Sequence, residues 1–233
     1  MKKVTSKTLN KMIVAYLLER YAPLNFKKKS GLDSLYRWEG QAYTWLCPLT
    51  HPSWSKERSE ECIEIIPSSQ FGFMIPTQIY RHFMLDEDLL VKPESAGGIR
   101  LNYPYLSNGA LTRLEFFPET SQEEFLNIIG SVFDKILARL AEIRKPTDVL
   151  AIYLNRNAHG SAEYDLAHWN DYTGILTGLN YAALYGPEHY LMLKKRHLPF
   201  FNQFDDTLDM KVRALKMIAY LDAVVAGTET PPA

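Results

Sequence analysis

The sequence predicts an α+β fold, in which a leading helix precedes an antiparallel sheet of about five strands and a helical half packs on that sheet. Two changes in hydrophobic periodicity indicate this fold. The spacing of apolar residues changes from helical to alternating after Lys29, and it returns to helical at Ser121. In a chain of 233 residues, of which 46% are hydrophobic, the core is large enough to need no disulfide or structural metal.

The opening segment is expected to form an amphipathic helix that ends near Pro23. Its apolar residues recur at three- and four-residue spacing, and lysines occupy another face. The apolar residues are Leu9, Met12, Ile13, Tyr16 and Leu17.

Segments of alternating apolar and polar residues follow, and we interpret each as a short strand. The first two are expected to form a hairpin around Gly40. Pro, Gly, Asn and acidic clusters separate the strands, and short connections favour antiparallel pairing. The predicted strands are 35–39, 43–49, 62–66, 71–75, 99–103 and 111–117.

A capping box opens the helical half, because the Ser121 hydroxyl and the Glu124 carboxylate can each accept a hydrogen bond from the other's backbone amide. Apolar residues then keep helical spacing from Phe125 to Leu140. Segment 147–155 fits either a short helix or a buried strand. Further helices are expected over 171–185, 188–201 and 208–226.

The chain is expected to form a single domain over residues 1–227, followed by a flexible tail over 228–233. Within the domain, 1–118 would hold the leading helix and sheet, and 119–227 the helical half. Residues 92–98 contain Pro and Gly, but we interpret them as a loop and not as an interdomain linker.

Charge excludes some classes of partner. Lys and Arg number 26 against 27 Asp and Glu, so the net charge of −1 argues against a surface built for nucleic acid. The basic first 29 residues are interpreted as a solvated face, and no nucleic-acid partner is expected.

No membrane partner is expected either, because the longest uncharged run, over residues 172–187, is too short for a bilayer. Polar residues after the first lysines replace the apolar core of a signal peptide, which favours a cytoplasmic protein. Cys47 and Cys62 are expected to be reduced core thiols that would pair only if adjacent.

The strong catalytic motifs are absent. The sequence contains no Gly-x-Ser-x-Gly elbow, phosphate-binding Gly-rich loop, His-Glu-x-x-His helix or Cys-x-x-Cys pair. An enzyme is therefore less expected than a binding protein, and no cofactor is predicted.

One cluster nevertheless supports an alternative. Asp165 and His168 would share a helical face that Asp171 continues, which suits an oxygen and nitrogen metal site in a metal-assisted hydrolase. The simpler interpretation makes Asp171 a helix N-cap and the others ordinary polar residues. The candidate ligands are His159, Glu163, Asp165, His168 and Asp171.

Acidic clusters next to aromatic residues indicate a surface for a basic protein partner. Some of these carboxylates are explained by solvated loops and helix N-termini. The predicted partner-binding residues are Trp54, Glu57, Glu60, Glu61, Asp86, Glu87, Asp88, Phe204, Asp205 and Asp206.

The leading helix, the turn Asn25-Phe26-Lys27-Lys28-Lys29 and the strand Leu35-Tyr36-Arg37-Trp38 resemble a bacterial family of domains of unknown function. That family begins with a helix, a Gly-Phe-Lys-Lys-Lys turn and a strand carrying Phe-Tyr-Arg, so Asn25 replaces Gly and Leu35 replaces Phe. Some relatives are immunity proteins of polymorphic toxin systems. The resemblance covers roughly the first third of the chain and implies a cytoplasmic binding protein.

These observations favour a non-enzymatic bacterial interaction protein, an immunity-like inhibitor that binds a partner such as a cognate toxin through acidic and aromatic surface. The metal-assisted hydrolase is one alternative. A structural or regulatory subunit that oligomerises through its helical half is another.

Overall fold

The computed structural model describes residues 4–28, 33–84, 99–102, 114–154, 172–201 and 209–232. Helix α1 (Ser6–Arg20) and the 3-10 helix η1 (Ala22–Leu24) precede strands β1 (Lys27–Lys28), β2 (Leu35–Glu39), β3 (Ala42–Ser55) and β4 (Glu60–Phe73). Next come α2 (Met74–Met84), β5 (Ile99–Asn102) and β6 (Leu114–Phe116). The later helices are α4 (Gln122–Leu140), α5 (Pro146–Leu154), α6 (Tyr172–Tyr185), α7 (Pro187–Phe201) and α8 (Met210–Val225).

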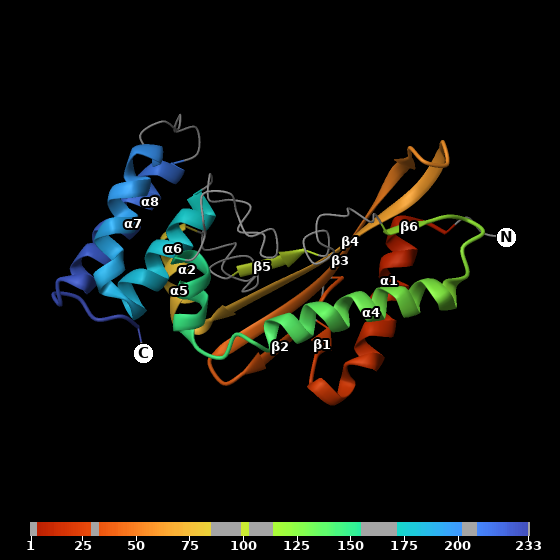
Figure 1. The fold of residues 1–233 in the computed structure, drawn as a ribbon, viewed down its shortest axis with the longest axis horizontal. Helices are drawn as coiled ribbons and strands as arrows, with labels where there is room; N and C mark the ends of the chain where they lie inside the picture. The colour runs from red at the N-terminus through yellow and green to blue at the C-terminus, as the bar shows by residue number, and fades with distance from the viewer. Residues whose placement is uncertain are drawn as a thin grey trace.

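The predicted α+β class is confirmed. The strands form one antiparallel sheet in the order β1-β2-β3-β4-β5, and β6 also pairs with β4. Strands β3 and β4 pair without interruption from Ala42 opposite Phe73 to Ser55 opposite Glu60. Strand β2 covers only the first part of β3, from Ala42 to Leu46. Much of the long hairpin therefore extends beyond its β2 neighbour (Figure 1).

The sheet differs from the prediction at β4. Segments 62–66 and 71–75 are one strand up to Phe73, and Ile75 lies in helix α2, which the alternating pattern concealed. Pro67 does not break the strand, because it lies between the stretches of β4 that pair with β6 and with β5. Pro67 lies opposite Pro48 of β3, and on the other edge of β4 no strand pairs with it, so its missing N–H costs no ladder hydrogen bond on that edge. Segment 147–155, whose pattern fits either a short helix or a buried strand, is helical as part of α5.

Helices α1 and α4 lie across one face of the sheet (Figure 1). Their inward residues, including Ile13, Leu17, Phe133 and Ile136, are fully buried together with Leu46 of β3. Burial of each such side chain contributes about 1.5–3 kcal/mol. Thr5 caps α1 by accepting a hydrogen bond from the Thr8 amide (3.2 Å), and Ser121 caps α4 similarly from Glu124 (3.4 Å).

A polar network joins α1 to α4 at the surface. The Arg20 guanidinium forms an ion pair with Asp134, and the Tyr21 hydroxyl donates to Asp134 Oδ1 at 2.9 Å. The hydrogen bond from Arg20 lowers the pKa of Asp134, although partial burial opposes this shift. Burial first, and then the bond to Asp134, raises the pKa of Tyr21. The ionised carboxylate is thus the form that the fold stabilises.

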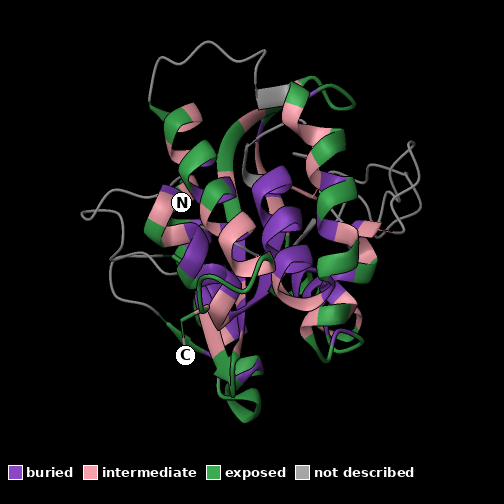
Figure 2. Ribbon diagram, turned by 90° about the vertical axis from the view of Figure 1, so that its left-hand side faces the viewer, coloured by how far each residue is buried: buried purple, intermediate pink, exposed green. Residues whose placement is uncertain are grey.

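The other helices gather at one end of the sheet (Figure 1). Helix α6 contacts α2, α5, α7 and α8, and its residues 174–183 are all buried. Figure 2 shows this buried helix among more exposed neighbours. The helical group therefore does not follow the order of the chain. Helix α2, which precedes α4 in sequence, belongs to this group, whereas α4 packs on the sheet.

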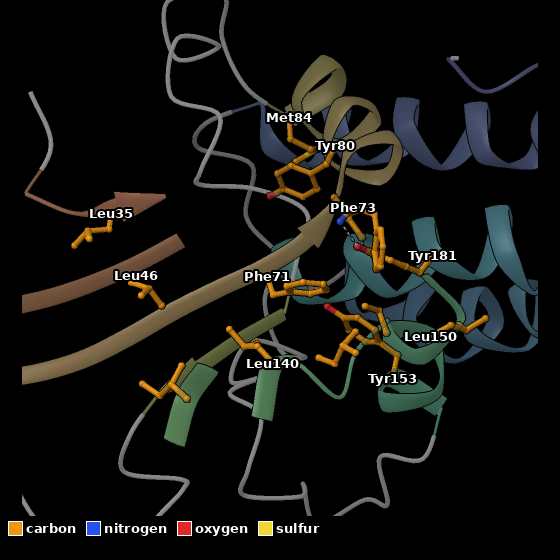
Figure 3. Packing of buried hydrophobic residues seen from close by; sticks show 14 of the residues in the cluster. Leu35, Leu46, Phe71, Phe73, Tyr80, Met84, Leu140, Leu150, Tyr153 and Tyr181 are labelled. Carbon is orange, nitrogen blue, oxygen red and sulfur yellow. Dashed lines mark hydrogen bonds between the residues drawn. The ribbon is translucent and has the colours of Figure 1, made fainter. Parts of the chain in front are cut away.

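A buried hydrogen bond ties this helical group to the sheet. The backbone N–H of Phe73, the last residue of β4, donates to the Tyr181 hydroxyl of α6 at 3.0 Å (Figure 3). Tyr181 is fully buried, and its ring stacks on Tyr153 of α5. Asn180 of the same helix donates to the Pro76 carbonyl at 2.7 Å. The start of α2 is therefore held by side chains of α6.

Neither Cys47 nor Cys62 forms a disulfide and both are buried, as expected for reduced core cysteines. Cys47 lies opposite Ser68, whereas Cys62 lies opposite Ser53, six residues further along β3. At about 3.3 Å per residue this separation is roughly 20 Å, far beyond the reach of a disulfide. In the part of the chain that the structure describes, no helix is long and apolar enough to span a bilayer.

Replacing Tyr181 by Phe should destabilise the protein by about 1–3 kcal/mol, because it leaves the buried Phe73 amide without an acceptor. Chemical denaturation would measure this change. Tyr185→Phe is the matched control, since Tyr185 is only half buried, and we expect less than about 0.5 kcal/mol there. Equal losses in the two variants would contradict this role for Tyr181.

Replacing Asp134 by Ala should cost about 1 kcal/mol at neutral pH, a value discounted for solvent screening because Asp134 is 46% exposed. The carboxyl pKa is lower in the folded protein than its ordinary value of 3.8, so its contribution is fully present above 3.8 and is lost as the pH falls through the lower folded value. Denaturation curves of the two proteins should converge in acid. Lys135→Ala, at an exposed neighbouring position, should show no such convergence.

Candidate functional site

The structure brings part of the predicted partner-binding surface together at one place. Trp54, Glu57, Glu60 and Glu61 all lie at the free end of the β3–β4 hairpin. We call residues 54–61 the hairpin tip. The remaining predicted partner-binding residues, Asp86, Glu87, Asp88, Phe204, Asp205 and Asp206, lie outside the described residues. The alternative metal ligands His159, Glu163, Asp165, His168 and Asp171 do so as well.

The hairpin tip projects because its neighbours end before it. The Thr50 hydroxyl donates to the carbonyl of Ser6, the first residue of α1, at 3.0 Å, so β3 beyond Thr50 extends past that helix. On the other side, β6 reaches only Ile63 of β4. Figure 1 accordingly shows the tip at the end of the molecule opposite the helical group.

Trp54 is the main apolar feature of the tip. It lies directly opposite Glu61, and alternation along β3 places both on the face that carries Leu46 in the core. Since α1 does not reach this far, Trp54 stays 56% exposed. A tryptophan this exposed, beside a carboxylate, is typical of a contact surface.

Arg58 anchors the tip to the segment that follows β6. Its guanidinium forms ion pairs with Glu60 (3.4 Å) and with Glu119, and it lies 4.1 Å from the centre of the Phe117 ring. The hydrogen bond that Arg58 donates to Glu119 raises the pKa of Arg58. The Ser55 hydroxyl adds a bond to Glu115 at 2.7 Å. These contacts hold the backbone of the tip, where Ser59 adopts a left-handed conformation with φ of 54°.

The carboxylates of the tip do not form a single acidic face. Glu60 lies on the opposite side of the sheet from Trp54 and Glu61, and its charge is paired with Arg58. Glu57 is exposed in the turn. The acidic surface beside Trp54 is thus narrower than the sequence suggested, because strand alternation separates neighbouring glutamates.

A second polar cluster lies behind the tip, on the face that carries Glu60. Glu64 accepts a hydrogen bond from the Ser53 hydroxyl (3.1 Å) and contacts His51 Nε2 at 3.2 Å. Sequence reasoning missed this cluster, although the alternation His51-x-Ser53 opposite Glu64 marks it once the hairpin register is known.

This cluster does not have the geometry of a nucleophilic triad. In such a triad the serine hydroxyl is hydrogen-bonded to the histidine, which removes its proton. Here Ser53 and His51 both contact the same carboxylate oxygen, so Glu64 organises them without activating the serine. Within the described ranges, no group of three or more His, Cys, Asp and Glu side chains is arranged to hold a metal ion.

Comparison of the chain with protein-family models, with curated proteins and with solved structures found no match. The chemistry of the hairpin tip must therefore be judged from its own geometry. That geometry is an exposed aromatic side chain with a facing carboxylate, on a backbone held by an arginine anchor.

Replacing Arg58 by Met should loosen the hairpin tip without unfolding the protein, because the Arg58 side chain is largely solvent-exposed. We expect severalfold faster hydrogen exchange at the amides of residues 56–60 and an almost unchanged thermal midpoint. Lys56→Met removes a neighbouring cation in the same turn and should leave exchange unchanged. Unaltered hydrogen exchange in the Arg58 variant would contradict this role, because the turn would then keep its conformation without the Arg58 contacts.

Proposed function

We propose that this protein is a non-enzymatic binding protein that recognises a protein partner through the hairpin tip. More specifically, we propose an immunity-like inhibitor that occludes a basic partner, such as a toxin, in the bacterial cytoplasm. The observation that carries this proposal is the exposed Trp54, presented at the end of a long paired hairpin.

A side chain in this position suits an interface anchor. Tryptophan is enriched among residues that dominate binding energy, since it buries a large apolar area with few rotatable bonds. Trp54 already has a supported backbone, because Arg58 ties the turn to Glu119 and Phe117. Little conformational entropy would then be lost on binding.

The charges near Trp54 favour a basic partner. Glu61 lies directly across the strand pair, and Glu57 is exposed in the turn. Carboxylates at the rim of an aromatic anchor accelerate encounter with a cationic surface and disfavour acidic partners. The polar cluster around Glu64 has no activated nucleophile, which favours binding over catalysis.

The first elements support the family resemblance as part of this proposal. After helix α1, Asn25 adopts a left-handed conformation with φ of 59°, which a glycine also adopts readily. Phe26 is buried, Lys27 and Lys28 are exposed, and β2 begins at Leu35. Lys27 and Lys28 form the short strand β1 within the segment that the family has as a turn, and apart from this strand the order resembles the helix, turn and strand of the immunity-related family.

The experiment is capture of a partner by immobilised protein from cells that carry the neighbouring genes, followed by titration of the purified pair. Trp54→Ala should weaken binding by about 30-fold or more, the loss typical of an interface anchor. Glu61→Lys should slow association, with an effect that shrinks in high salt.

Trp38→Ala is the matched control. Trp38 is also exposed, at 44%, but it lies at the other end of the sheet against Tyr43. This variant should bind as the wild type does. A partner that the Trp54 variant holds with unchanged affinity would contradict the proposal, as would turnover of a substrate by the purified protein alone.

A further inference from the structure

A hollow of about 410 Å³ lies beside β3 where β2 begins, at Leu35 opposite Leu46. Helix α1 contributes Lys7 and Asn10 to its lining, and the segment before β2 contributes Asp33 and Ser34. Trp45 and Leu49 of β3 add apolar surface. We call this hollow the edge pocket.

The edge pocket exists because the outer edge of β3 changes neighbour. β2 pairs with β3 only up to Leu46, and beyond it the Asn10 amide of α1 donates to the Pro48 carbonyl. Pro48 and Pro52 have no N–H to offer at this edge, which protects it from strand addition. Where the neighbour of β3 changes from strand β2 to helix α1, a gap remains between the elements. Side chains from three segments line this gap.

Two opposite charges line the edge pocket without neutralising each other. Lys7 and Asp33 are both exposed, and the ion pairs found among the described residues include none between them. Oppositely charged side chains in one small pocket normally form an ion pair, unless the pocket holds them apart. A ligand that carries both a negative and a positive group satisfies each of them at once.

Three residues of the lining also carry a buried polar atom with no hydrogen-bond partner. These atoms are Asn10 Oδ1, Ser34 Oγ and Trp45 Nε1. Asn10 is 8% exposed and Ser34 is 2% exposed. An unsatisfied buried polar group costs free energy, so three such atoms around one pocket favour water or a polar ligand there. Together they offer an acceptor, a hydroxyl and an N–H donor.

We propose that the edge pocket binds a free α-amino acid. Its carboxylate would meet the Lys7 ammonium, and its ammonium would meet the Asp33 carboxylate. The side chain of the ligand would lie against Leu49 and the Trp45 ring. The volume is near the lower end of the range for small-molecule sites, which suits one amino acid better than a larger cofactor.

The test is calorimetric titration of the full-length protein with the free L-amino acids at millimolar concentrations. The best ligand is then compared with its N-acetyl derivative, which lacks the ammonium, and with its amide, which lacks the carboxylate. We expect the free amino acid to bind and both derivatives to bind at least about tenfold more weakly. Equal binding of either derivative, or no binding by any amino acid, overturns the proposal.

Variants separate the two charges from general effects. Lys7→Met and Asp33→Asn should each weaken binding at least about tenfold, whereas Lys11→Met, one turn along the same exposed face of α1, should not. Since all three positions are exposed, thermal unfolding should be nearly unchanged. Trp54→Ala should bind the amino acid normally, so this proposal and the proposed function fail independently.

Ser34→Ala gives a readout that a purely structural role would not. Without ligand, removal of an unpartnered buried hydroxyl should leave the thermal midpoint unchanged or raise it. The affinity for the amino acid should nevertheless fall severalfold. A lowered midpoint with unchanged affinity would show that the hydroxyl serves the fold and would contradict its place in the site.

Discussion

Every other part of this structure depends on the uninterrupted pairing of β3 with β4. The register runs from Ala42 opposite Phe73 to Ser55 opposite Glu60, which makes one long ribbon. Because strand alternation is strict, that register decides which residues face α1 and α4 and which face the other side. A shift by one residue would expose Leu46 and bury the polar residues His51 and Glu64. The hydrophobic face therefore determines where the polar groups of the hairpin lie.

The ribbon also separates the two proposed sites. Trp54 stands at the free end, beyond the first residue of α1, where nothing in the described chain covers it fully. The edge pocket lies along the side, where β2 stops and Asn10 takes over the edge of β3. The opposite end carries the helical group, which Tyr181 joins to the last residue of β4. A protein partner at the tip and a small molecule at the edge would not compete for the same surface.

Local signals were sufficient where one interaction dominated. The capping serine and the apolar spacing predicted α4 closely, and the alternation around Gly40 predicted β2 and its hairpin. Prediction failed where the conformation of a segment depends on contacts with residues distant in sequence. Pro67 signalled a break, yet it lies opposite Pro48 of β3, where neither β5 nor β6 pairs with the other edge of β4, and Ile75 continued an alternating pattern although the backbone turns helical at Met74. The edge pocket was missed because Lys7, Asp33 and Trp45 are distant in sequence and carry no common motif.

The sequence by itself determined the α+β class, most helix and strand positions, and the presence of Trp54 among acidic residues, since these follow from local periodicity and composition. Tertiary structure alone decided that Glu61 shares a face with Trp54 while Glu60 does not, that Ser53, His51 and Glu64 meet, and that Lys7 and Asp33 line one pocket. The physical reason is that these relations depend on strand register and on where elements end. Both are set by packing between residues far apart in the chain, which no local pattern records.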